Sequence, residues 1–447
     1  MEDTICAIST SLGGAISIVR VSGTNAIKIV NKLFSTKNLE TAKSHTIHYG
    51  YIVNGTQKID EVLVSVFKAP KTYTCEDIVE INCHGGISTT NKVLELLLTN
   101  GCRLAEGGEF TKRAFLNGRI DLIQAEAVSD LLSSTSDQAR SLSLNQVKGD
   151  LSLKIKNIRN TILDLLANIA VNIDYPEYED AEEVTIEILQ SKIPNIINQL
   201  NNLLNTASSG QIIKNGINVS IVGRPNVGKS SLLNKLLQED KAIVTDIAGT
   251  TRDIVEGSIS LNGIRFNFTD TAGIRDTKDK VEKIGVNKSK QYLKSSDYII
   301  CVLNGTEQLT KDDQEILDAL DNDKSIIFVN KNDQKLKIDV DKKNIIYGNT
   351  IDANGIDELK NKLIENFNLD KINSNDITYL SNARQISLVK QAKNTLEKVN
   401  DSLNELIPID MLEIDIKKSY DLLGEITGET YQDELLDKLF ENFCLGK

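Results

Sequence analysis

The feature that most constrains this chain is a phosphate-binding loop at residues 223–230. It reads Gly223-Arg224-Pro225-Asn226-Val227-Gly228-Lys229-Ser230, a complete G-x-x-x-x-G-K-S pattern. Residues 217–222 before it read as a buried strand, and residues 231–237 after it read as an amphipathic helix. Such a loop points backbone N–H groups at phosphates, and the helix N-terminus adds positive potential. We therefore expect a P-loop nucleotide-binding domain, in which Lys229 reaches the β- and γ-phosphates and Ser230 holds Mg²⁺.

Two downstream loops carry residue types that such a domain uses around the γ-phosphate. Thr250-Thr251 lies in a polar loop suited to sensing Mg²⁺ and the γ-phosphate. Asp270-Thr271-Ala272-Gly273 follows a strand-like stretch at residues 264–268. Asp270 fits the second, water-mediated Mg²⁺ contact. Taken alone, each loop also reads as an ordinary polar turn.

A fourth motif indicates which base is bound. Asn330-Lys331-Asn332-Asp333 follows the apolar run at residues 325–329, as a turn between a strand and a helix. A carboxylate at Asp333 can accept two hydrogen bonds from guanine N1–H and the 2-amino group, a donor pair that adenine lacks. The four motifs in this order predict that the chain binds GTP.

Composition bounds the remaining possibilities. At 447 residues the chain is about three average domains long, and its 40% hydrophobic and 26% charged residues are ordinary for a globular protein. No apolar run of about 18 residues and no leader pattern is present, so we expect a cytoplasmic protein with no membrane association. Six scattered cysteines and three histidines argue against a disulfide framework or structural zinc site. The net charge of −12 argues against a wholly basic nucleic-acid surface but permits a local basic patch.

The hydrophobic pattern changes along the chain. A mixed α/β pattern is followed from Asp121 by long amphipathic helices, with apolar faces over residues 151–169 and 189–204. Pro194 is expected near the start of the regular part of the second helix. Helical patterns resume at residues 389–406 and 432–443, beyond the nucleotide-binding region. We expect a G domain inserted into one helical domain whose two parts pack together; two separate helical domains are the alternative.

The predicted fold class is therefore multidomain, α/β plus all-α. We expect an N-terminal domain at residues 1–117, a first helical part at 118–213, a P-loop (Ras-like) G domain at 214–372 and a second helical part at 373–447.

Further motifs resemble those of one family, the MnmE (TrmE) GTPases of tRNA-uridine modification. They are Gly-Glu-Phe-Thr-Lys-Arg-Ala-Phe-Leu-Asn at 108–117, Asp-Leu-Ile-Gln-Ala-Glu-Ala at 121–127, Thr-Asp-Ile-Ala-Gly-Thr-Thr-Arg-Asp at 245–253, and Phe-Cys-Leu-Gly-Lys at 443–447. The last is similar to the family's Cys-x-Gly-Lys ending. The resemblance covers nearly the whole chain, and these motifs are specific, whereas the G motifs fit many GTPases.

The resemblance implies a function and a set of partners. It implies a potassium-dependent GTP hydrolase that is a homodimer and forms a heterotetramer with the FAD-dependent protein MnmG. Together they would install an aminomethyl-type group, carboxymethylaminomethyl, at C5 of the wobble uridine of certain tRNAs. The one-carbon unit would come from a 5,6,7,8-tetrahydrofolate derivative, the 5-formyl or 5,10-methylene form, bound to the N-terminal folate-binding and dimerisation domain.

By resemblance, four residues are the folate contacts. Arg20 and Glu80 match the family's positions, and Lys447 resembles its terminal contact. A carboxylate such as Glu80 can accept from the amide and amino edge of a pterin, and Arg20 can pair with folate carboxylates or with the polar ring edge. Arg119 stands where the family usually has a lysine, which keeps the charge but changes the geometry. Cys444 resembles the family's C-terminal thiol, and its role stays open.

The resemblance also extends the set of GTP-binding residues. They are Asn226, Val227, Gly228, Lys229, Ser230, Ser231, Thr245, Asp246, Ile247, Ala248, Gly249, Thr250, Thr251, Asp270, Thr271, Ala272, Gly273, Asn330, Lys331 and Asp333. Ser230 and Thr251 would hold Mg²⁺. Asn226 and the backbone carbonyls of Thr245, Ile247 and Thr250 would hold K⁺. The loop that usually reads Ser-Ala-Lys on the base side is Gly348-Asn349-Thr350 here, which leaves GTP affinity open.

The catalytic groups depart from those of small switch GTPases. Those proteins place a water-orienting glutamine directly after the Asp-x-x-Gly motif, but this chain has Ile274 there. An aliphatic side chain cannot orient water. By resemblance, K⁺ takes the place of an arginine finger, Lys229 contacts the phosphates and Glu282 orients the attacking water through a bridging water.

Two other functions fit parts of the sequence. A GTP-switched RNA-binding or ribosome-assembly factor would use the same G domain, with the N-terminal domain as a docking module. Such a factor would have no reason to bind folate, so the predicted folate contacts Arg20, Glu80 and Lys447 favour the tRNA-modification function over it. A scaffold with a degenerate GTPase conflicts with the intact Lys229 and Ser230.

The assignment of Glu282 predicts a specific kinetic defect. Glu282→Ala should lower the turnover of GTP strongly and leave GTP affinity nearly unchanged, because the carboxylate would act on water and not on the nucleotide. Steady-state hydrolysis and equilibrium GTP binding measure the two quantities. Equal losses in both would contradict the assignment.

Overall fold

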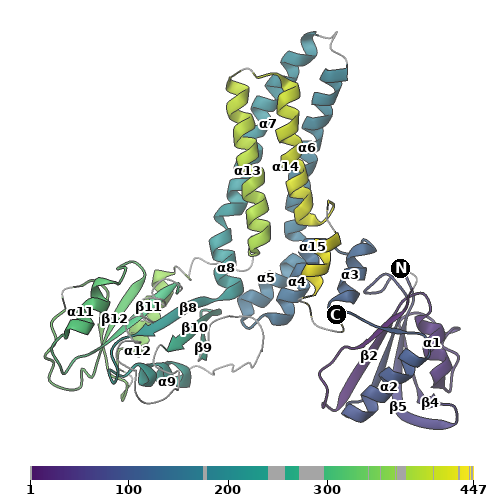
Figure 1. Cartoon of the computed structure of the whole chain (residues 1–447), viewed down its shortest axis with the longest axis horizontal. Helices are drawn as coiled ribbons and strands as arrows, with labels where there is room; N and C mark the ends of the chain where they lie inside the picture. Colours follow the sequence, from purple (N-terminus) through teal and green to yellow (C-terminus); the bar gives the residue numbers. More distant parts are fainter. Residues whose placement is uncertain are drawn as a thin grey trace. The chain divides into compact units, whose positions relative to one another are not determined.

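The computed structural model describes most of the chain, in two compact units. The described residues are 3–174, 179–239, 257–270, 296–340, 342–352, 354–367, 369, 379–405, 407–430, 433–441, 443 and 446. The first unit comprises Met1–Ser129, Gln146–Leu200 and Ser387–Lys447. The second comprises Asp130–Asn145 and Asn201–Ile386. Figure 1 labels the elements of both units.

A seven-stranded sheet forms the N-terminal part of the first unit. Its order is β3-β4-β5-β6-β2-β1-β7, with only the β1–β7 pair parallel among the pairings of the described residues. The strands are β1 (Ile5–Ile8), β2 (Ile16–Ser22), β3 (Phe34–Ser35), β4 (Thr46–Asn54), β5 (Gln57–Phe67), β6 (Ile78–His84) and β7 (Arg103–Leu104). Helices α1 (Ala26–Leu33) and α2 (Ile87–Thr99) follow β2 and β6, and α3 (Glu109–Leu116) follows β7.

Alternation along the strands gives this sheet two different faces. Val19 and Val21 of β2 are buried in one core with Val64 of β5 and with side chains of α1 and α2. Successive side chains of a strand point to opposite faces, so Arg20 and its register partner Glu80 lie on the other face. This second face, which α1 and α2 leave open, carries the candidate site.

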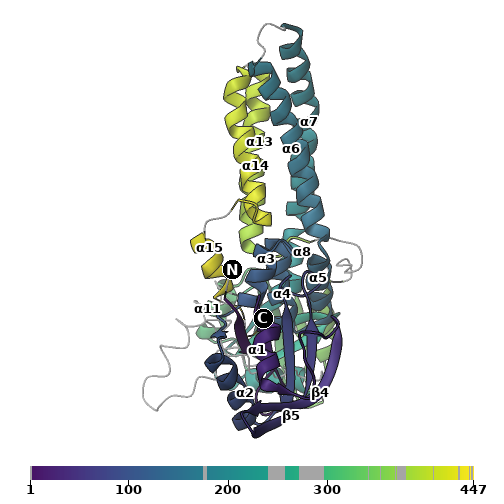
Figure 2. The ribbon, with the colours of Figure 1, turned by 90° about the vertical axis from the view of Figure 1, so that its right-hand side faces the viewer.

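Long helices make up the rest of the first unit. They are α4 (Leu122–Ser133), which continues into the second unit, α6 (Asp150–Asp174), α7 (Glu179–Asn205), α13 (Ala383–Asn404), α14 (Ile409–Thr427) and α15 (Asp433–Phe440). Figures 1 and 2 show α6, α7, α13 and α14 side by side, and α6 packs on α14. The helical segments before and after the nucleotide-binding region therefore pack together, as the sequence predicts.

The expected position of Pro194 is wrong. It lies well inside α7, not near the start of the helix. Proline removes one backbone hydrogen bond from a helix interior. The buried side chains of Leu189 and Ile193 before it and of Ile196 after it continue one apolar face, so packing keeps the helix going across the proline.

The second unit is built on a six-stranded sheet. Its order is β13-β12-β11-β8-β10-β9, and β9 is the antiparallel strand of the described pairings. The strands are β8 (Ile217–Val222), β9 (Gly257–Leu261), β10 (Ile264–Asp270), β11 (Tyr298–Asn304), β12 (Ser325–Asn330) and β13 (Ile345–Tyr347). Its described helices are α5 (Asp137–Lys148, which ends in the first unit), α8 (Ala207–Asn215), α9 (Lys229–Glu239), α11 (Lys311–Asp318) and α12 (Ile356–Asn366).

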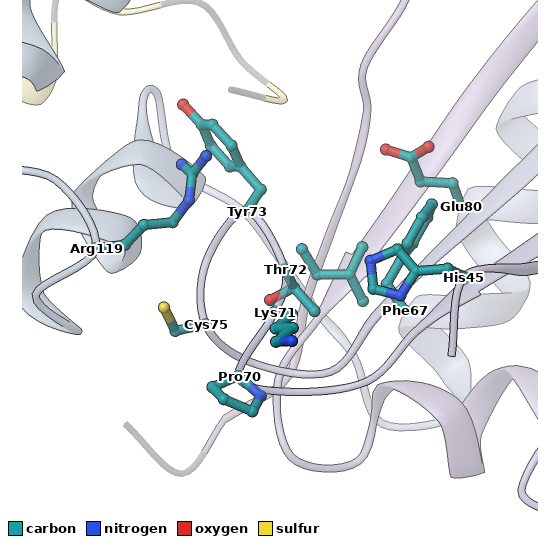
Figure 3. A pocket seen from close by; sticks show the side chains of 10 residues that line it. His45, Phe67, Pro70, Lys71, Thr72, Tyr73, Cys75, Glu80 and Arg119 are labelled. Carbon is teal, nitrogen blue, oxygen red and sulfur yellow. The ribbon is translucent and has the colours of Figure 1, made fainter. Parts of the chain in front are cut away.

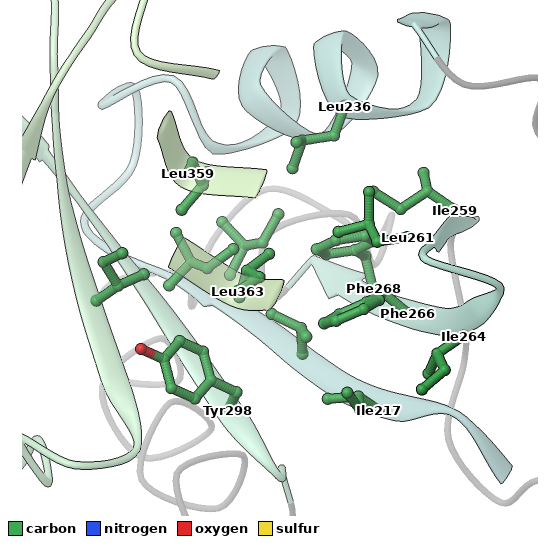
Figure 4. Packing of buried hydrophobic residues seen from close by; sticks show 14 of the residues in the cluster. Ile217, Leu236, Ile259, Leu261, Ile264, Phe266, Phe268, Tyr298, Leu359 and Leu363 are labelled. Carbon is green, nitrogen blue, oxygen red and sulfur yellow. The ribbon is translucent and has the colours of Figure 1, made fainter. Parts of the chain in front are cut away.

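One apolar core lies on a face of this sheet. Phe266 and Phe268 of β10 pack there with Leu236 of α9 and with Leu359 and Leu363 of α12 (Figure 4). Ala139 and Leu142 of α5 join the same core. The core fixes α9, and with it the loop that precedes α9. No helix in the described part of the chain combines the length and apolarity that crossing a bilayer requires.

Gly428 offers a test of the packing at the end of α14. It adopts φ +79°, and an added Cβ would lie 2.8 Å from the Phe115 ring and 3.0 Å from Leu122. Gly428→Ala should destabilise this region by about 2–5 kcal/mol, from left-handed strain plus overpacking. Gly118 is the matched control, because it has φ +72° and no heavy atom within 4 Å of an added Cβ.

Gly118→Ala should therefore cost only the strain, about 1–2 kcal/mol. Hydrogen exchange of peptides from α3 and from the end of α14 measures both losses as local opening free energies. Equal losses in the two variants would show that the predicted clash is relieved by small shifts of Phe115.

Candidate functional site

The phosphate-binding loop lies between β8 and α9, as the sequence predicts. Gly223, Asn226 and Gly228 have φ values of +147°, +62° and +105°. A Cβ on Gly223 would lie 2.3 Å from the Val302 carbonyl oxygen, so only glycine fits. Backbone turns of this kind aim successive N–H groups into one concavity, which suits an anion.

Lys229 is held against this loop. Its Nζ donates to the carbonyl oxygens of Gly223 and Arg224, both at 2.8 Å, and the residue is 5% exposed. The ammonium group therefore lies at the loop itself, within the first turn of α9, where the helix dipole also favours an anion. Ser230 and Ser231 follow in the same turn.

Asn330 connects the base-recognition turn to the phosphate-binding loop. It is buried at the end of β12, and its Nδ2 donates to the Val227 carbonyl oxygen at 2.9 Å. Its Oδ1 accepts from the Lys331 N–H at 2.9 Å. Asp333, three residues further on, is exposed and thus accessible to a base. The structure therefore brings two of the predicted motifs together through one side chain.

The unusual loop at residues 348–350 has an internal organiser. Asn349 is buried, and its Oδ1 accepts from the N–H groups of Ile351 and Asp352 at 3.0 and 2.7 Å. Its Nδ2 donates to Asn332 in the neighbouring turn at 3.3 Å. The Asn349 side chain thus fixes the conformation of the loop that has Gly348-Asn349-Thr350 in place of Ser-Ala-Lys.

Arg224 is a loop residue that the sequence did not single out. Its Nε lies 2.8 Å from Asp313 Oδ1 and its Nη2 lies 3.0 Å from Glu307 Oε2. Burial alone lowers the pKa of this guanidinium, but the two carboxylates outweigh burial and raise it. Arg224 therefore anchors the loop to the start of α11. Nothing in the linear sequence pairs a residue at 224 with one at 313.

Many of the predicted nucleotide and metal residues lie outside the described residues. These are Thr245, Asp246, Ile247, Ala248, Gly249, Thr250, Thr251, Thr271, Ala272, Gly273 and Glu282, together with Cys444 and Lys447 near the C-terminus. Asp270 ends β10, and only its backbone is described.

A cavity of about 480 Å³ opens on the uncovered face of the N-terminal sheet (Figure 3). Its volume is in the range of small-molecule sites. The lining combines charged, aromatic and aliphatic side chains: His45, Phe67, Pro70, Lys71, Thr72, Tyr73, Cys75, Ile78, Glu80 and Arg119. Two of the predicted folate contacts, Glu80 and Arg119, are among them.

Arg20 lies next to this cavity, paired with Glu80. Its Nε and Nη2 lie 2.9 and 2.8 Å from Glu80 Oε1, and its Nη1 donates to the Gly446 carbonyl oxygen at 3.3 Å. Both contacts to Glu80 use the same oxygen. The carboxylate therefore keeps capacity to accept from a ligand.

Tyr73 is a cavity residue that the sequence did not indicate. Its ring centre lies 4.8 Å from the Arg119 guanidinium carbon and 5.9 Å from that of Arg20. Its hydroxyl lies 2.9 Å from Thr111 Oγ1 of α3. Arg20, Glu80 and Arg119, which are far apart in sequence, thus converge around one aromatic ring. An isolated tyrosine in a polar loop gives no signal of this role.

Helix α3 holds the loop that carries Tyr73. Asn117 Nδ2 donates to the Thr74 carbonyl oxygen at 2.7 Å, and the Nη1 of Arg113 lies 3.1 Å from Glu76 Oε1. Arg113 is 1% exposed, so it belongs to no surface patch. Its Nη2 also contacts Asp3 and Glu109 at 2.7 and 3.0 Å.

The charges around Arg113 stabilise one another. Burial alone raises the pKa of the Glu109 carboxyl. Hydrogen bonds from Arg103, from the Glu106 N–H and from Arg113 outweigh burial and lower this pKa below its ordinary value. The network joins the segment before β1, α3 and the cavity loop.

The strand order, the phosphate-binding loop and the Asn330–Asp333 turn are those of a P-loop GTPase domain. Comparison with known proteins identifies the family. A model described as "GTP-binding protein TrmE N-terminus" matches residues 4–119, and one described as "MnmE helical domain" matches residues 122–444.

Relatives match over the full length. The tRNA modification GTPase MnmE of Ligilactobacillus salivarius (strain UCC118) is 51% identical over 455 residues, covering 100% of this chain and 98% of that protein. The protein of the same name from Bacillus cytotoxicus is 50% identical, covering 100% and 99%. That from Streptococcus thermophilus (strain CNRZ 1066) is 51% identical over 450 residues, covering 100% and 98%. The chain therefore belongs to the MnmE (TrmE) family.

Solved structures match a smaller part of the chain. The G domain of the T. maritima FeoB iron transporter is 24% identical, covers 34% of this chain and 98% of that one, and has a TM-score of 0.24.

The buried charge network predicts that Arg113 contributes more to stability than its neighbour Lys112. Arg113→Met should destabilise the N-terminal part by about 3–5 kcal/mol, because it leaves the half-buried Glu76 without its cation and removes one of the two cations of the buried Glu109. Lys112→Met on the same helix is the control, since Lys112 pairs with the exposed Asp437 and should cost less than about 1 kcal/mol. Proteolysis across a urea series compares the two. Similar losses would show that Arg113 contributes no more than a surface pair.

Proposed function

We propose that this protein is a potassium-dependent GTP hydrolase of tRNA modification. With an FAD-dependent partner, MnmG, it installs a carboxymethylaminomethyl group at C5 of the wobble uridine of certain tRNAs. The one-carbon unit comes from a tetrahydrofolate derivative. The observation that carries the proposal is the Arg20–Glu80 pair beside a ligand-sized cavity, in a chain that also carries a formed phosphate-binding loop. The names of the relatives support it, since each is called a tRNA modification GTPase.

In the G domain, three described loop residues bind GTP and its metal ion. Lys229 contacts the β- and γ-phosphates, Ser230 holds Mg²⁺ and Asp333 accepts from guanine. Asn226 lies in the loop with φ +62° and is exposed, so its side chain is accessible to a cation. Together with Thr245, Ile247 and Thr250 it would hold K⁺, and Thr251 would complete the Mg²⁺ site. The two cations supply charge neutralisation around the transferred phosphate.

Glu282 orients the attacking water in this proposal. The other GTP contacts are the GTP-binding residues predicted from the sequence. The proposed domains comprise residues 1–117, 118–213, 214–372 and 373–447.

In the N-terminal domain, Glu80 accepts hydrogen bonds from the amide and amino edge of the pterin. Arg20 neutralises the charge of Glu80 and orients the carboxylate through its two contacts. Arg119 faces the same cavity and supplies a further cation for the bound folate, with Lys447 as another contact. The bound tetrahydrofolate supplies the one-carbon unit. The residues of the cavity fit it because they combine an acceptor, cations and an aromatic ring.

The open sheet face supports the proposed homodimer. On this face Ile47, Tyr49 and Leu63 are 67%, 56% and 48% exposed on the adjacent strands β4 and β5, and Ile16 is 64% exposed on β2. A band of large apolar side chains of this kind is typical of a surface that another protein covers. We assign it to a second copy of the chain. The heterotetramer with MnmG, the tRNA substrate and a cytoplasmic location complete the proposal.

Calorimetric titration of the full chain with 5-formyltetrahydrofolate tests the proposal. We expect saturable binding, weakened roughly 10- to 100-fold in Arg20→Ala by loss of charge-assisted hydrogen bonds. A variant that lacks Lys447 should also bind more weakly. Lys92→Ala on α2, which covers the opposite sheet face, is the matched control and should bind as the unchanged protein does.

Absence of folate binding by a folded, GTP-hydrolysing protein would refute the folate part of the proposal. A GTP-switched RNA-binding or ribosome-assembly factor would then be the better reading of the same G domain.

A further inference from the structure

Two loops at the edge of the N-terminal cavity carry basic side chains. Residues 43–46 and 68–72 contribute Lys43, His45, Lys68 and Lys71, and the two loops contain no Asp or Glu. We call these four side chains the basic rim. His45 and Lys71 line the cavity directly, and Figure 3 shows His45 beside Phe67 and Lys71 near Pro70.

The two loops are fixed to each other. The His45 N–H donates to the Val66 carbonyl oxygen at 2.8 Å, and the Lys68 N–H donates to Ser44 Oγ at 2.8 Å. Lys68 Nζ donates to the Glu40 carbonyl oxygen at 3.0 Å, so this lysine also holds its neighbouring loop. Hydrogen bonds therefore hold the basic rim in place at the edge of the cavity.

The charges of the rim differ from those on the other side of the cavity. Arg20 is paired with Glu80, and Arg119 stacks on Tyr73. No ion pair joins Lys43 or Lys71 to a carboxylate among the described residues. Glu76, the acidic residue nearest in sequence to the second loop, pairs with Arg113, and the next one, Asp77, accepts the Ala69 N–H at 2.8 Å through its Oδ1. Lys43 and Lys71 thus remain available to an anionic ligand.

The sheet register sets the direction from Glu80 to the rim. Ser65 pairs with Glu80 and Phe67 pairs with Ile78, where β5 ends and the second loop begins. Glu80 therefore lies two residues, roughly 7 Å, from the strand end. A ligand that gives its donor edge to Glu80 and extends along the strands arrives at His45 and Lys71.

We propose that the basic rim binds the glutamate tail of a polyglutamylated tetrahydrofolate. The inference rests on the proposed folate site. A cavity of about 480 Å³ suits one drug-sized ligand, so further glutamyl residues must leave across its edge. Each added glutamyl residue brings one more carboxylate, and ammonium groups that lack a carboxylate partner attract it.

Calorimetric titration of the full chain with the mono- and triglutamyl forms of 5-formyltetrahydrofolate tests the inference. We expect the triglutamyl form to bind at least fivefold more tightly. The preference should fall below twofold in the double variant Lys43→Met, Lys71→Met, because the triglutamyl form should lose more affinity than the monoglutamyl form. Lys28→Met on α1, which covers the other sheet face, is the matched control and should keep the preference.

Three other outcomes would overturn the inference, each in a distinct way. Equal affinities for the two forms in the unchanged protein would refute the rim and leave the folate site intact. A preference kept in the double variant but lost in Arg119→Met would place the tail on the opposite side of the cavity. Failure of both forms to bind would refute the folate site and the rim together.

Discussion

A buried guanidinium organises the N-terminal part of this protein. Arg113 contacts carboxylates from three separate segments, Asp3, Glu76 and Glu109, and its own side chain is removed from solvent. A buried charge of this kind is stable only when its hydrogen-bonding groups are all used. A planar guanidinium with five donors can serve three carboxylates at once, whereas an ammonium group is a point charge. The cavity loop, α3 and the segment that leads into β1 are therefore positioned as one unit.

The nucleotide-binding loop depends on a comparable link in the second unit. Strands β8 and β12 are both parallel to β11, so their carboxyl ends and the loops that follow lie at the same edge of the sheet. The Asn330 side chain joins the two loops, because it donates a hydrogen bond to the Val227 carbonyl oxygen. The motif that would read the base thus supports the loop that would hold the phosphates. A substitution at Asn330 would affect both functions of the domain.

Sequence patterns predicted the helices and strands better than they predicted the contacts between side chains. The strand at Ile217–Val222 matches its predicted bounds because five of its six residues are buried, which produces a nearly continuous apolar run between turn signals. Helix α14 was missed although its buried residues Ile409, Leu412 and Ile416 recur at helical spacing. Pro194 was misplaced because tertiary packing of a long helix overrides the local preference of proline. Family resemblance indicated Arg20, Glu80 and Arg119, whereas Tyr73, Arg113 and Arg224 had no linear signal. Their roles come from pairs of residues up to 110 positions apart, as between Arg113 and Asp3.

Net charge is a poor guide to the ligand of this protein. The chain carries a formal charge of −12, yet the edge of its N-terminal cavity is basic. Salt screens charges beyond roughly 8–10 Å, so an anion close to the rim experiences mainly Lys43, Lys71 and their neighbours. At longer range the acidic chain repels the same anion and slows its approach. Local attraction combined with long-range repulsion favours a ligand that binds mainly through its fit to the cavity, with its additional charges contributing only once they reach the rim.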